Sequence, residues 1–298
     1  LAPCWGYQID ETASVVYGVY EHYKYTKSEK FLKDNLKMCE KAIDFLKKYL
    51  KDWLNIEGTE ERDKDKVQEE IENSVNRQGH KYHISYDLWE MNEGIHLYSL
   101  ASIYSAFDSI LNIYKALGKN VSEFENNRLK EEKIQKNKRT IENLQTQLKK
   151  YINENLYDEE KKSYVRNTED RKMDISILGA ITPFNMFKPK EKKIRNTVER
   201  INMSLRTYTG GYQRFEQDNY MNGNPWPIAN LWMTLYYLEN GEKKKAKETF
   251  DFVVKTCGKH YFLGEQIDNN TLKPDWVIGL GWSHAMFIIV LEKLSNIK

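Results

Sequence analysis

Two glutamates in aromatic surroundings are the residues of this chain whose types and positions could do acid–base chemistry. Glu90 follows Trp89 in "SYDLWEMNEG", and Glu265 lies in "GEQ", far along the sequence, so that only folding could bring the two together. Paired carboxylates across a cleft can cleave a glycosidic bond, because a protonated one gives its proton to the leaving oxygen while an ionised one activates water. An apolar neighbour such as Trp89 raises the pKa of an acid, and a more polar setting keeps a base charged.

The segments around these glutamates are unusually aromatic. Four connecting segments are rich in Trp, Tyr, Gly and Glu, and each leads into a helical pattern: "CWGYQIDE" (4–11), "YDLWEMNEG" (86–94), "GGYQRFEQDNYMNGNPWP" (210–227) and "LGEQIDNNTLKPDWVIGLGWSHA" (263–285). Indole and phenol faces suit the C–H faces of sugar rings. Arg214 could bind sugar hydroxyls through its rigid fork of donors. Aromatic loops gathered at one end of a helical bundle predict a cleft there.

Each of these residues also has an ordinary structural interpretation, and the residues taken singly leave both open. Glu90 could be a first-turn charge favoured by a helix dipole, and Glu265 a surface loop charge. Arg214 could form a surface ion pair. The same holds for six further residues. Trp226 and Trp282 could be core aromatics, Asp10 and Glu11 could be helix N-terminal charges, and His96 and His284 could be ordinary helix residues.

The elements that must position these residues are helices. Apolar residues recur at helical spacing over 13–23 and 32–50, and further helices are predicted over 95–117, 128–155, 227–238, 243–257 and 283–297. Gly118, Gly241 and Gly258 fall where such patterns end. The best strand candidate is "SYVR" at 163–166. The sequence therefore predicts an all-α fold of antiparallel helix pairs, and the absence of a repeat with a shared signature disfavours a solenoid scaffold.

Composition narrows the class of protein. The 298 residues carry 46 basic and 44 acidic side chains, so nothing predicts a nucleic-acid partner. The three cysteines have no metal-ligand spacing, and free thiols suggest a reducing compartment, so we expect a cytoplasmic protein that needs no metal or cofactor. No apolar run is long enough for a membrane span. Residues 55–79 are charged and poor in large apolar side chains, which predicts an exposed excursion within one domain of residues 1–298.

Several motifs, in order, resemble the catalytic domain of glycoside hydrolase family 15, the glucoamylases and their glucodextranase and trehalase relatives. They are "YDLWE" before a long apolar helix, "NGNPWPIANLW", and "GEQID" followed by "GLGWSHA". The opening "WGYQIDETASVVYGVYEHY" and the segment "MDISILGAITPFNMF" look like the prokaryotic branch. The resemblance spans almost the whole chain and favours the catalytic interpretation of Glu90 and Glu265.

The resemblance implies an (α/α)6 barrel and an inverting exo-hydrolase that releases β-glucose from non-reducing ends of α-glucans. By motif match, Glu90 is the general acid and Glu265 the general base. The resemblance also implies a set of substrate-binding residues, of which Trp5 has the weakest match: Trp89, Arg214, Gln266, Trp282 and Trp5. It favours α-1,4 bonds, with α-1,6-glucan hydrolysis, trehalose hydrolysis or a non-catalytic carbohydrate-binding or regulatory domain as alternatives.

Two departures from the family pattern stand out. Many members have a second Glu after the general acid, where this chain has Met91, so that a contact on the leaving side is absent or comes from elsewhere, with Glu93 a candidate. The family's "W-x-R-D" motif, which grips the terminal glucose, does not occur in the chain. We therefore expect a barrel that is incomplete at its N-terminus and packs against further helices, with a β-sandwich domain before it as in many prokaryotic members.

Overall fold

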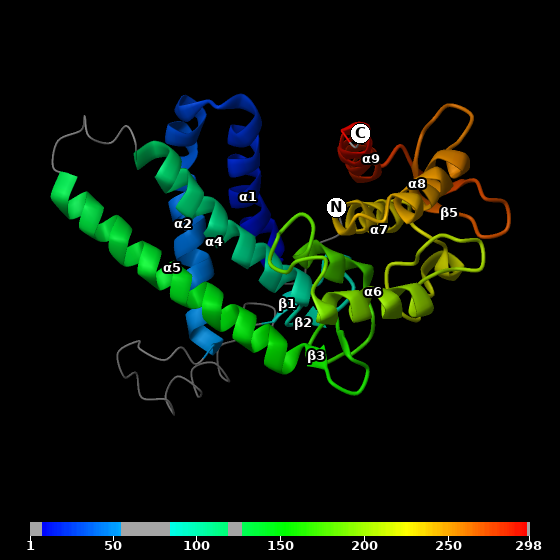
Figure 1. Ribbon diagram of the computed structural model, residues 1–298, viewed down its shortest axis with the longest axis horizontal. Coiled ribbons are helices and arrows are strands. Elements are labelled where there is room, and N and C mark those ends of the chain that lie inside the picture. Colours follow the sequence, from blue (N-terminus) through cyan, green and yellow to red (C-terminus); the bar gives the residue numbers. More distant parts are fainter. Residues whose placement is uncertain (1–7, 55–83, 119–126, 297–298) are drawn as a thin grey trace. The chain divides into compact units, whose positions relative to one another are not determined.

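The computed structural model describes residues 8–54, 84–118 and 127–296, and in these the chain is mostly helical (Figure 1). It divides into two compact units, Leu1–Asn155 and Leu156–Lys298. The expected all-α fold class is confirmed. Trp5 and the charged excursion at 55–79 lie outside the described residues, and the single domain of residues 1–298 stays a prediction.

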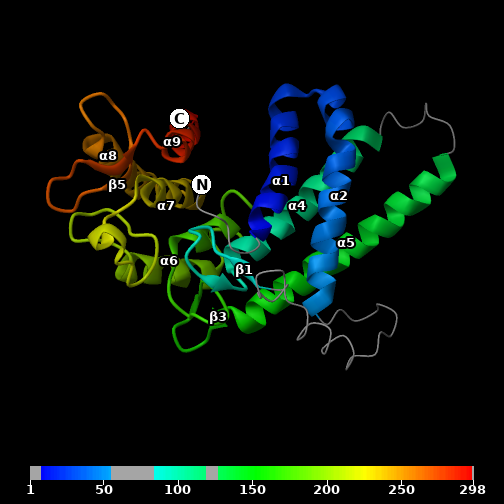
Figure 2. The same cartoon turned by 180° about the vertical axis from the view of Figure 1, so that it is seen from behind.

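The first unit is a group of helices with one short hairpin (Figures 1 and 2). Its elements are α1 (Ile9–Thr26), α2 (Glu29–Trp53), β1 (Ser85–Tyr86), β2 (Glu93–Gly94), α4 (Leu97–Gly118) and α5 (Asn127–Asn155). The connection from α1 to α2 is tight because Lys27 adopts a left-handed conformation and the Ser28 hydroxyl caps the next helix by accepting from the backbone N–H of Phe31 at 3.2 Å.

Helix α4 forms the centre of the first unit. It packs against α1, α2 and α5, and its small and apolar side chains are buried around much of its circumference. The Ser102 hydroxyl donates to the Ser99 carbonyl at 2.7 Å, so this buried polar group has a partner. The helix follows the β1–β2 hairpin in the chain, with only Ile95 and His96 between β2 and α4.

The second unit combines helices with two short hairpins. Its elements are β3 (Tyr157–Asp158), β4 (Ser163–Tyr164), the 3₁₀ turns η2 (Ile175–Ala180) and η3 (Tyr220–Gly223), and α6 (Lys192–Ser204), α7 (Pro227–Asn240), α8 (Lys243–Thr256), β5 (Gly264–Ile267), β6 (Pro274–Ile278) and α9 (Gly281–Ser295). Helix α7 is its buried centre and packs against α8, α9, η2 and β5. Gly241 ends α7 in the left-handed conformation, with φ 83°, as its position in the sequence predicts.

The structure adds several elements that the sequence patterns did not suggest, among them helix α6 and the strand pair β5–β6. Helix α6 was missed because its sequence is mostly charged, although Ile194, Val198 and Ile201 do form a buried stripe at helical spacing. Strands β5 and β6 form an antiparallel pair, with an irregularity in register between Gly264 and Gln266, where we had expected a loop. These strands are short, and their pairing partner is visible only in the tertiary structure. None of the helices in the described residues is long and apolar enough to cross a membrane.

Candidate active site

Glu90 lies in the turn of the β1–β2 hairpin. Ser85 pairs with Gly94 and Tyr86 with Glu93, which leaves Asp87 to Asn92 as the connection. Glu90 has φ 57°, and its backbone N–H donates to the carbonyl of Asp87 at 3.0 Å. A non-glycine residue in this conformation is held there by its surroundings. The alternative interpretation of Glu90 as a helix-start charge is therefore wrong, because α4 begins only at Leu97.

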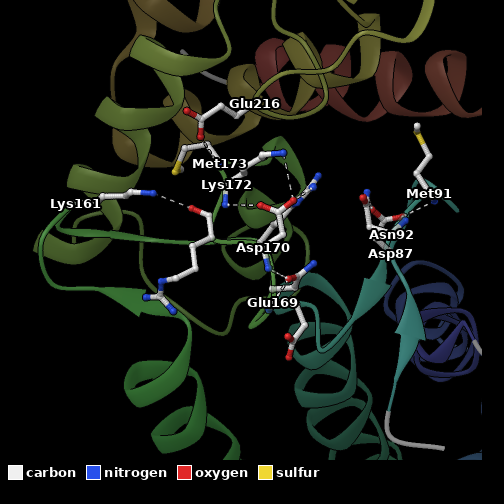
Figure 3. A network of polar contacts seen from close by, with 12 residues as sticks. Asp87, Met91, Asn92, Lys161, Glu169, Asp170, Lys172, Met173 and Glu216 are labelled. Atoms are coloured by element: carbon white, nitrogen blue, oxygen red, sulfur yellow. Dashed lines mark hydrogen bonds and ion pairs between the residues drawn. The ribbon is translucent and has the colours of Figure 1, made fainter. Parts of the chain in front are cut away.

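Asp87 fixes this turn through its side chain. Its Oδ1 accepts from the backbone N–H groups of Met91 at 2.9 Å and Asn92 at 3.3 Å, and its Oδ2 accepts from Asn92 Nδ2 at 2.7 Å. Figure 3 shows this carboxylate turned toward Asn92 and the Met91 backbone. The turn therefore has a defined shape, with the ring of Trp89 buried at 7% exposure and Met91 exposed at 46%.

Asp10 is the other notable carboxylate of the first unit. It lies in the first turn of α1, as predicted, but it is only 6% exposed and lies 3.3 Å from the hydroxyl of Ser99, which donates to it. Burial raises the pKa of Asp10 from 3.8 to about 6, and the charges of Glu11 and Asp87 act in the same direction while the Ser99 bond opposes them. Sequence reasoning read Asp10 as an ordinary helix charge, because burial leaves no local signal.

Glu265 lies on β5, next to the irregularity in the strand pair, and is partly buried. Its Oε2 is buried and has no hydrogen-bond partner among the described residues. Burial raises the pKa of the Glu265 carboxyl above its ordinary value, and the positive charge of Arg214 lowers it. A carboxylate with these two opposing influences stays a competent base, because burial makes it more basic while a nearby cation favours its charged form.

Arg214 is buried, and Asp218 holds its fork. Its Nε donates to Asp218 Oδ2 at 2.8 Å and its Nη2 to Asp218 Oδ1 at 3.0 Å, with both side chains almost free of solvent contact. The guanidinium carbon lies 4.6 Å from the ring centroid of Trp226 and 5.0 Å from those of Phe215 and Tyr220. Arg214 therefore does form an ion pair, but the pair is buried and not on the surface. Two of the guanidinium nitrogens that we expected to bind sugar donate to Asp218 instead.

Aromatic side chains surround this charged group. The ring of Tyr220 packs edge-on against Trp276 with centroids 6.2 Å apart. The pKa of Tyr220 is raised by burial first and by the charge of Glu265 next, while Arg214 lowers it and Asp218 raises it. Tyr220 thus lies within electrostatic reach of all three charged residues. Trp282, at the start of α9, packs edge-on against Trp232 of α7, with centroids 6.1 Å apart.

Gln266 is fully buried beside Glu265 on β5. Neither its amide oxygen nor its amide nitrogen has a hydrogen-bond partner within the described residues. Substrate binding by Gln266 stays a prediction.

The structure thus brings together, in the second unit, Glu265, Arg214 and the aromatic residues around them, and in the first unit Trp89, Glu90 and Asp87. Sequence reasoning missed Asp87, Asp218 and Tyr220. The one available signal was the four-residue spacing of Arg214 and Asp218. Such a spacing predicts an ion pair only within a helix, and this segment is not helical. Among the residues that the structure describes, no three or more His, Cys, Asp or Glu side chains are grouped so as to hold a metal ion.

The mostly helical architecture is that of an all-α glycosidase fold. The model of the glycosyl hydrolases family 15 matches residues 6–261, and the chain belongs to this family.

Named relatives agree with this assignment. An uncharacterized glycosyl hydrolase of Methanocaldococcus jannaschii is 27% identical over 303 residues, which cover 97% of this chain and 42% of the relative. Trehalase 1 of Sulfolobus acidocaldarius is 25% identical over 138 residues, 46% of this chain and 24% of the relative. A solved bacterial glucoamylase, in complex with acarbose, has a TM-score of 0.65 at 18% identity, over 97% of this chain and 41% of that one. The chain spans less than half the length of each.

Proposed function

We propose that the chain is the catalytic part of an inverting, exo-acting glycoside hydrolase that releases β-glucose from non-reducing ends of α-glucans, with α-1,4 bonds preferred. Family membership supports glycoside hydrolysis, and the likeness to a glucoamylase supports the substrate class. The observation that carries the proposal is the surroundings of Glu265: a partly buried carboxylate with an unpartnered oxygen, next to a fixed cation and aromatic rings.

In this proposal Glu265 is the general base. It takes a proton from the water that attacks the anomeric carbon, while the positive charge of Arg214 keeps it ionised before the reaction. No described protein group donates a hydrogen bond to the Oε2 of Glu265, so no protein donor competes with the water for that oxygen. Tyr220 and Trp282, which are both partly exposed, supply flat apolar surfaces of the kind on which sugar rings bind.

Glu90 is the general acid and gives its proton to the leaving oxygen. The Asp87 carboxylate fixes the turn from which Glu90 projects, and Trp89 anchors it by burial. An inverting mechanism requires the carboxyl groups of Glu90 and Glu265 to lie about 6.5–9.5 Å apart, with room for water between them.

The test uses Glu90→Gln and Glu265→Gln in the full-length protein, with Glu169→Gln as control because Glu169 is an exposed carboxylate of the second unit. We expect glucose release from maltose to fall by about 10²–10⁴-fold in the first two variants and to stay unchanged in the control. Proton NMR of the fresh product should show the β-anomer first. Wild-type rates in Glu90→Gln, or the α-anomer appearing first, would refute the assignment.

Trehalose is a second candidate substrate, and one observation favours it. One relative is named a trehalase. Comparing kcat/KM on maltose, isomaltose and trehalose decides among the α-1,4, trehalose and α-1,6 alternatives. Binding of oligosaccharide without turnover of any of them would show a non-catalytic domain.

A further inference from the structure

The strand pair β5–β6 has an extra residue opposite Glu265. Two pairs of residues define the register on either side of this glutamate: Gly264 with Ile278, and Gln266 with Asp275. Between these pairs β5 has one residue, Glu265, whereas β6 has two, Trp276 and Val277. Two residues of one strand that oppose a single residue of the other form a β-bulge. The bulge therefore places Trp276 across the strand pair from the residue that we propose as the general base.

Trp276 adopts a backbone conformation that favours glycine. Its φ is 62°, in the left-handed region, where a bulky side chain is an outlier that costs free energy. In a bulge whose first residue is left-handed, that residue is usually glycine. A tryptophan at this position lowers the stability of the backbone, so a task of the indole ring accounts for its presence better than stability does.

The backbone on both sides of Trp276 is fixed. The Trp276 N–H donates to Oδ1 of Asp275 at 2.8 Å, and Oδ2 of Asp275 accepts from Nδ2 of the buried Asn224 at 3.2 Å. A Cβ added to Gly264 would lie 2.9 Å from the carbonyl oxygen of Asp275 and 3.1 Å from its nitrogen, so the two strands are too close here for any other residue. Trp276 therefore projects from a well-defined part of β6.

The indole ring of Trp276 is open to solvent and lies beside the candidate site. The residue is 53% exposed. Its ring meets that of Tyr220 at 84°, with centroids 6.2 Å apart, and the Tyr220 ring in turn lies 5.0 Å from the guanidinium carbon of Arg214. Two flat apolar faces at nearly a right angle form a corner that suits the C–H faces of a sugar ring.

We propose that Trp276 is a specificity-determining residue, whose ring binds a sugar unit of the substrate beyond the terminal glucose, on the leaving side of the bond that is cleaved. A site that acts on chain ends encloses the terminal sugar, while the rest of the glucan extends toward solvent. A ring that stays half-exposed next to the base therefore suits a sugar on the solvent side. This inference rests on the proposed function and adds the residue that makes cleavage depend on what the terminal glucose is attached to.

The test compares two substrates that share the terminal glucose and differ in the group that leaves. Maltotriose loses a sugar, whereas α-glucosyl fluoride loses only fluoride. In the full-length protein with Trp276→Ala, kcat/KM for maltotriose should fall by about tenfold, mainly through KM, because apolar contact with the leaving sugar is lost. The value for α-glucosyl fluoride should stay unchanged. An equal fall on both substrates, or no fall on maltotriose, would overturn the inference.

The matched control is Tyr261→Ala. Tyr261 is also an exposed aromatic residue of the second unit, at 83%, and its φ of 60° is left-handed as well. It lies in the turn before β5 and not opposite Glu265. The ratio of kcat/KM for maltotriose over α-glucosyl fluoride should match that of the wild type. A fall as large as in Trp276→Ala would overturn the inference, because the effect would then not depend on the bulge.

Two further variants keep the test decisive if Trp276→Ala folds poorly. Glycine adopts a φ of 62° without strain, so Trp276→Gly should unfold at a higher urea concentration than Trp276→Ala and show the same loss on maltotriose. Trp276→Phe keeps a flat ring and should retain most of the wild-type ratio. A wild-type ratio in Trp276→Gly, or a ratio in Trp276→Phe as low as in Trp276→Ala, would overturn the inference.

Binding measured without hydrolysis separates this inference from the proposed function. Isothermal titration calorimetry with maltotriose, on Glu265→Gln with and without Trp276→Ala, should show a Kd about tenfold higher when the ring is absent. If the Kd rises so and the wild type releases no glucose, sugar binding by Trp276 holds and the proposed function fails. If the wild type releases glucose and Trp276→Ala changes neither the Kd nor the substrate ratio, the proposed function holds and the inference fails.

Discussion

Asp10→Asn should stabilise the folded chain at neutral pH. The carboxyl is 6% exposed, and burial outweighs both the Ser99 hydrogen bond and the favourable dipole of α1. A charge in a helix first turn gains only about 0.3–1 kcal/mol from the dipole, which is too little to compensate for burial. Asparagine keeps the shape and an acceptor for Ser99 but carries no charge to desolvate.

The magnitude follows from the pKa of Asp10. A rise from 3.8 to about 6 corresponds to about 3 kcal/mol between the two protonation states. Because the pKa is raised in the folded state, that state binds the proton more tightly. Stability is therefore greatest below the ordinary value and is lost as the pH rises toward about 6. Above about pH 6 the wild-type chain has therefore lost this contribution to its free energy of unfolding. The variant Asp10→Asn has no carboxyl to titrate at this position and loses nothing.

The assay is urea unfolding, followed by circular dichroism, of the wild type and Asp10→Asn at about pH 4 and about pH 7.5. We expect the variant to be more stable by up to about 3 kcal/mol at the higher pH and nearly equal at the lower one. Glu11→Gln is the matched control, since Glu11 is exposed in the same helix turn, and its effect should stay within about 0.5 kcal/mol. A variant that is less stable at neutral pH, or a difference that does not change with pH, would refute this reasoning.

Two further variants test packing and specificity. Gly211→Ala places a Cβ 2.5 Å from Pro225 Cβ and 2.7 Å from the Phe252 ring, so urea unfolding should show a loss of about 1–3 kcal/mol, whereas Gly18→Ala, with nothing within 4 Å, should be neutral or stabilising. A Gly211→Ala chain as stable as the wild type would contradict the close packing of this segment. Met91→Glu restores the carboxylate of many family members beside Glu90, and the ratio of kcat/KM for maltose over trehalose should rise by about tenfold. An unchanged ratio would mean that position 91 does not contact the leaving sugar.

Much of the helical framework could be predicted because it rests on local periodicity. The stripes over 32–50 and 128–155 predict α2 and α5 to within a few residues, since an amphipathic helix needs only its own spacing and a core to face. Helix α6 was missed although it has the same kind of stripe, because charge dominates its composition. The pair β5–β6 could not be predicted, because hydrogen bonds between strands depend on a partner that local sequence does not reveal.

The sequence by itself determined the class of fold, the ordered motifs of the family and the glutamates on which the proposed chemistry rests. Only the tertiary structure decided the surroundings of those glutamates. It placed Glu90 in a turn fixed by Asp87 and Glu265 on a strand beside the charge of Arg214, and it turned the fork of Arg214 to Asp218. The physical reason is that residue type and spacing are local properties. Burial, charge and hydrogen-bond partners depend on which distant segments the folded core brings into contact.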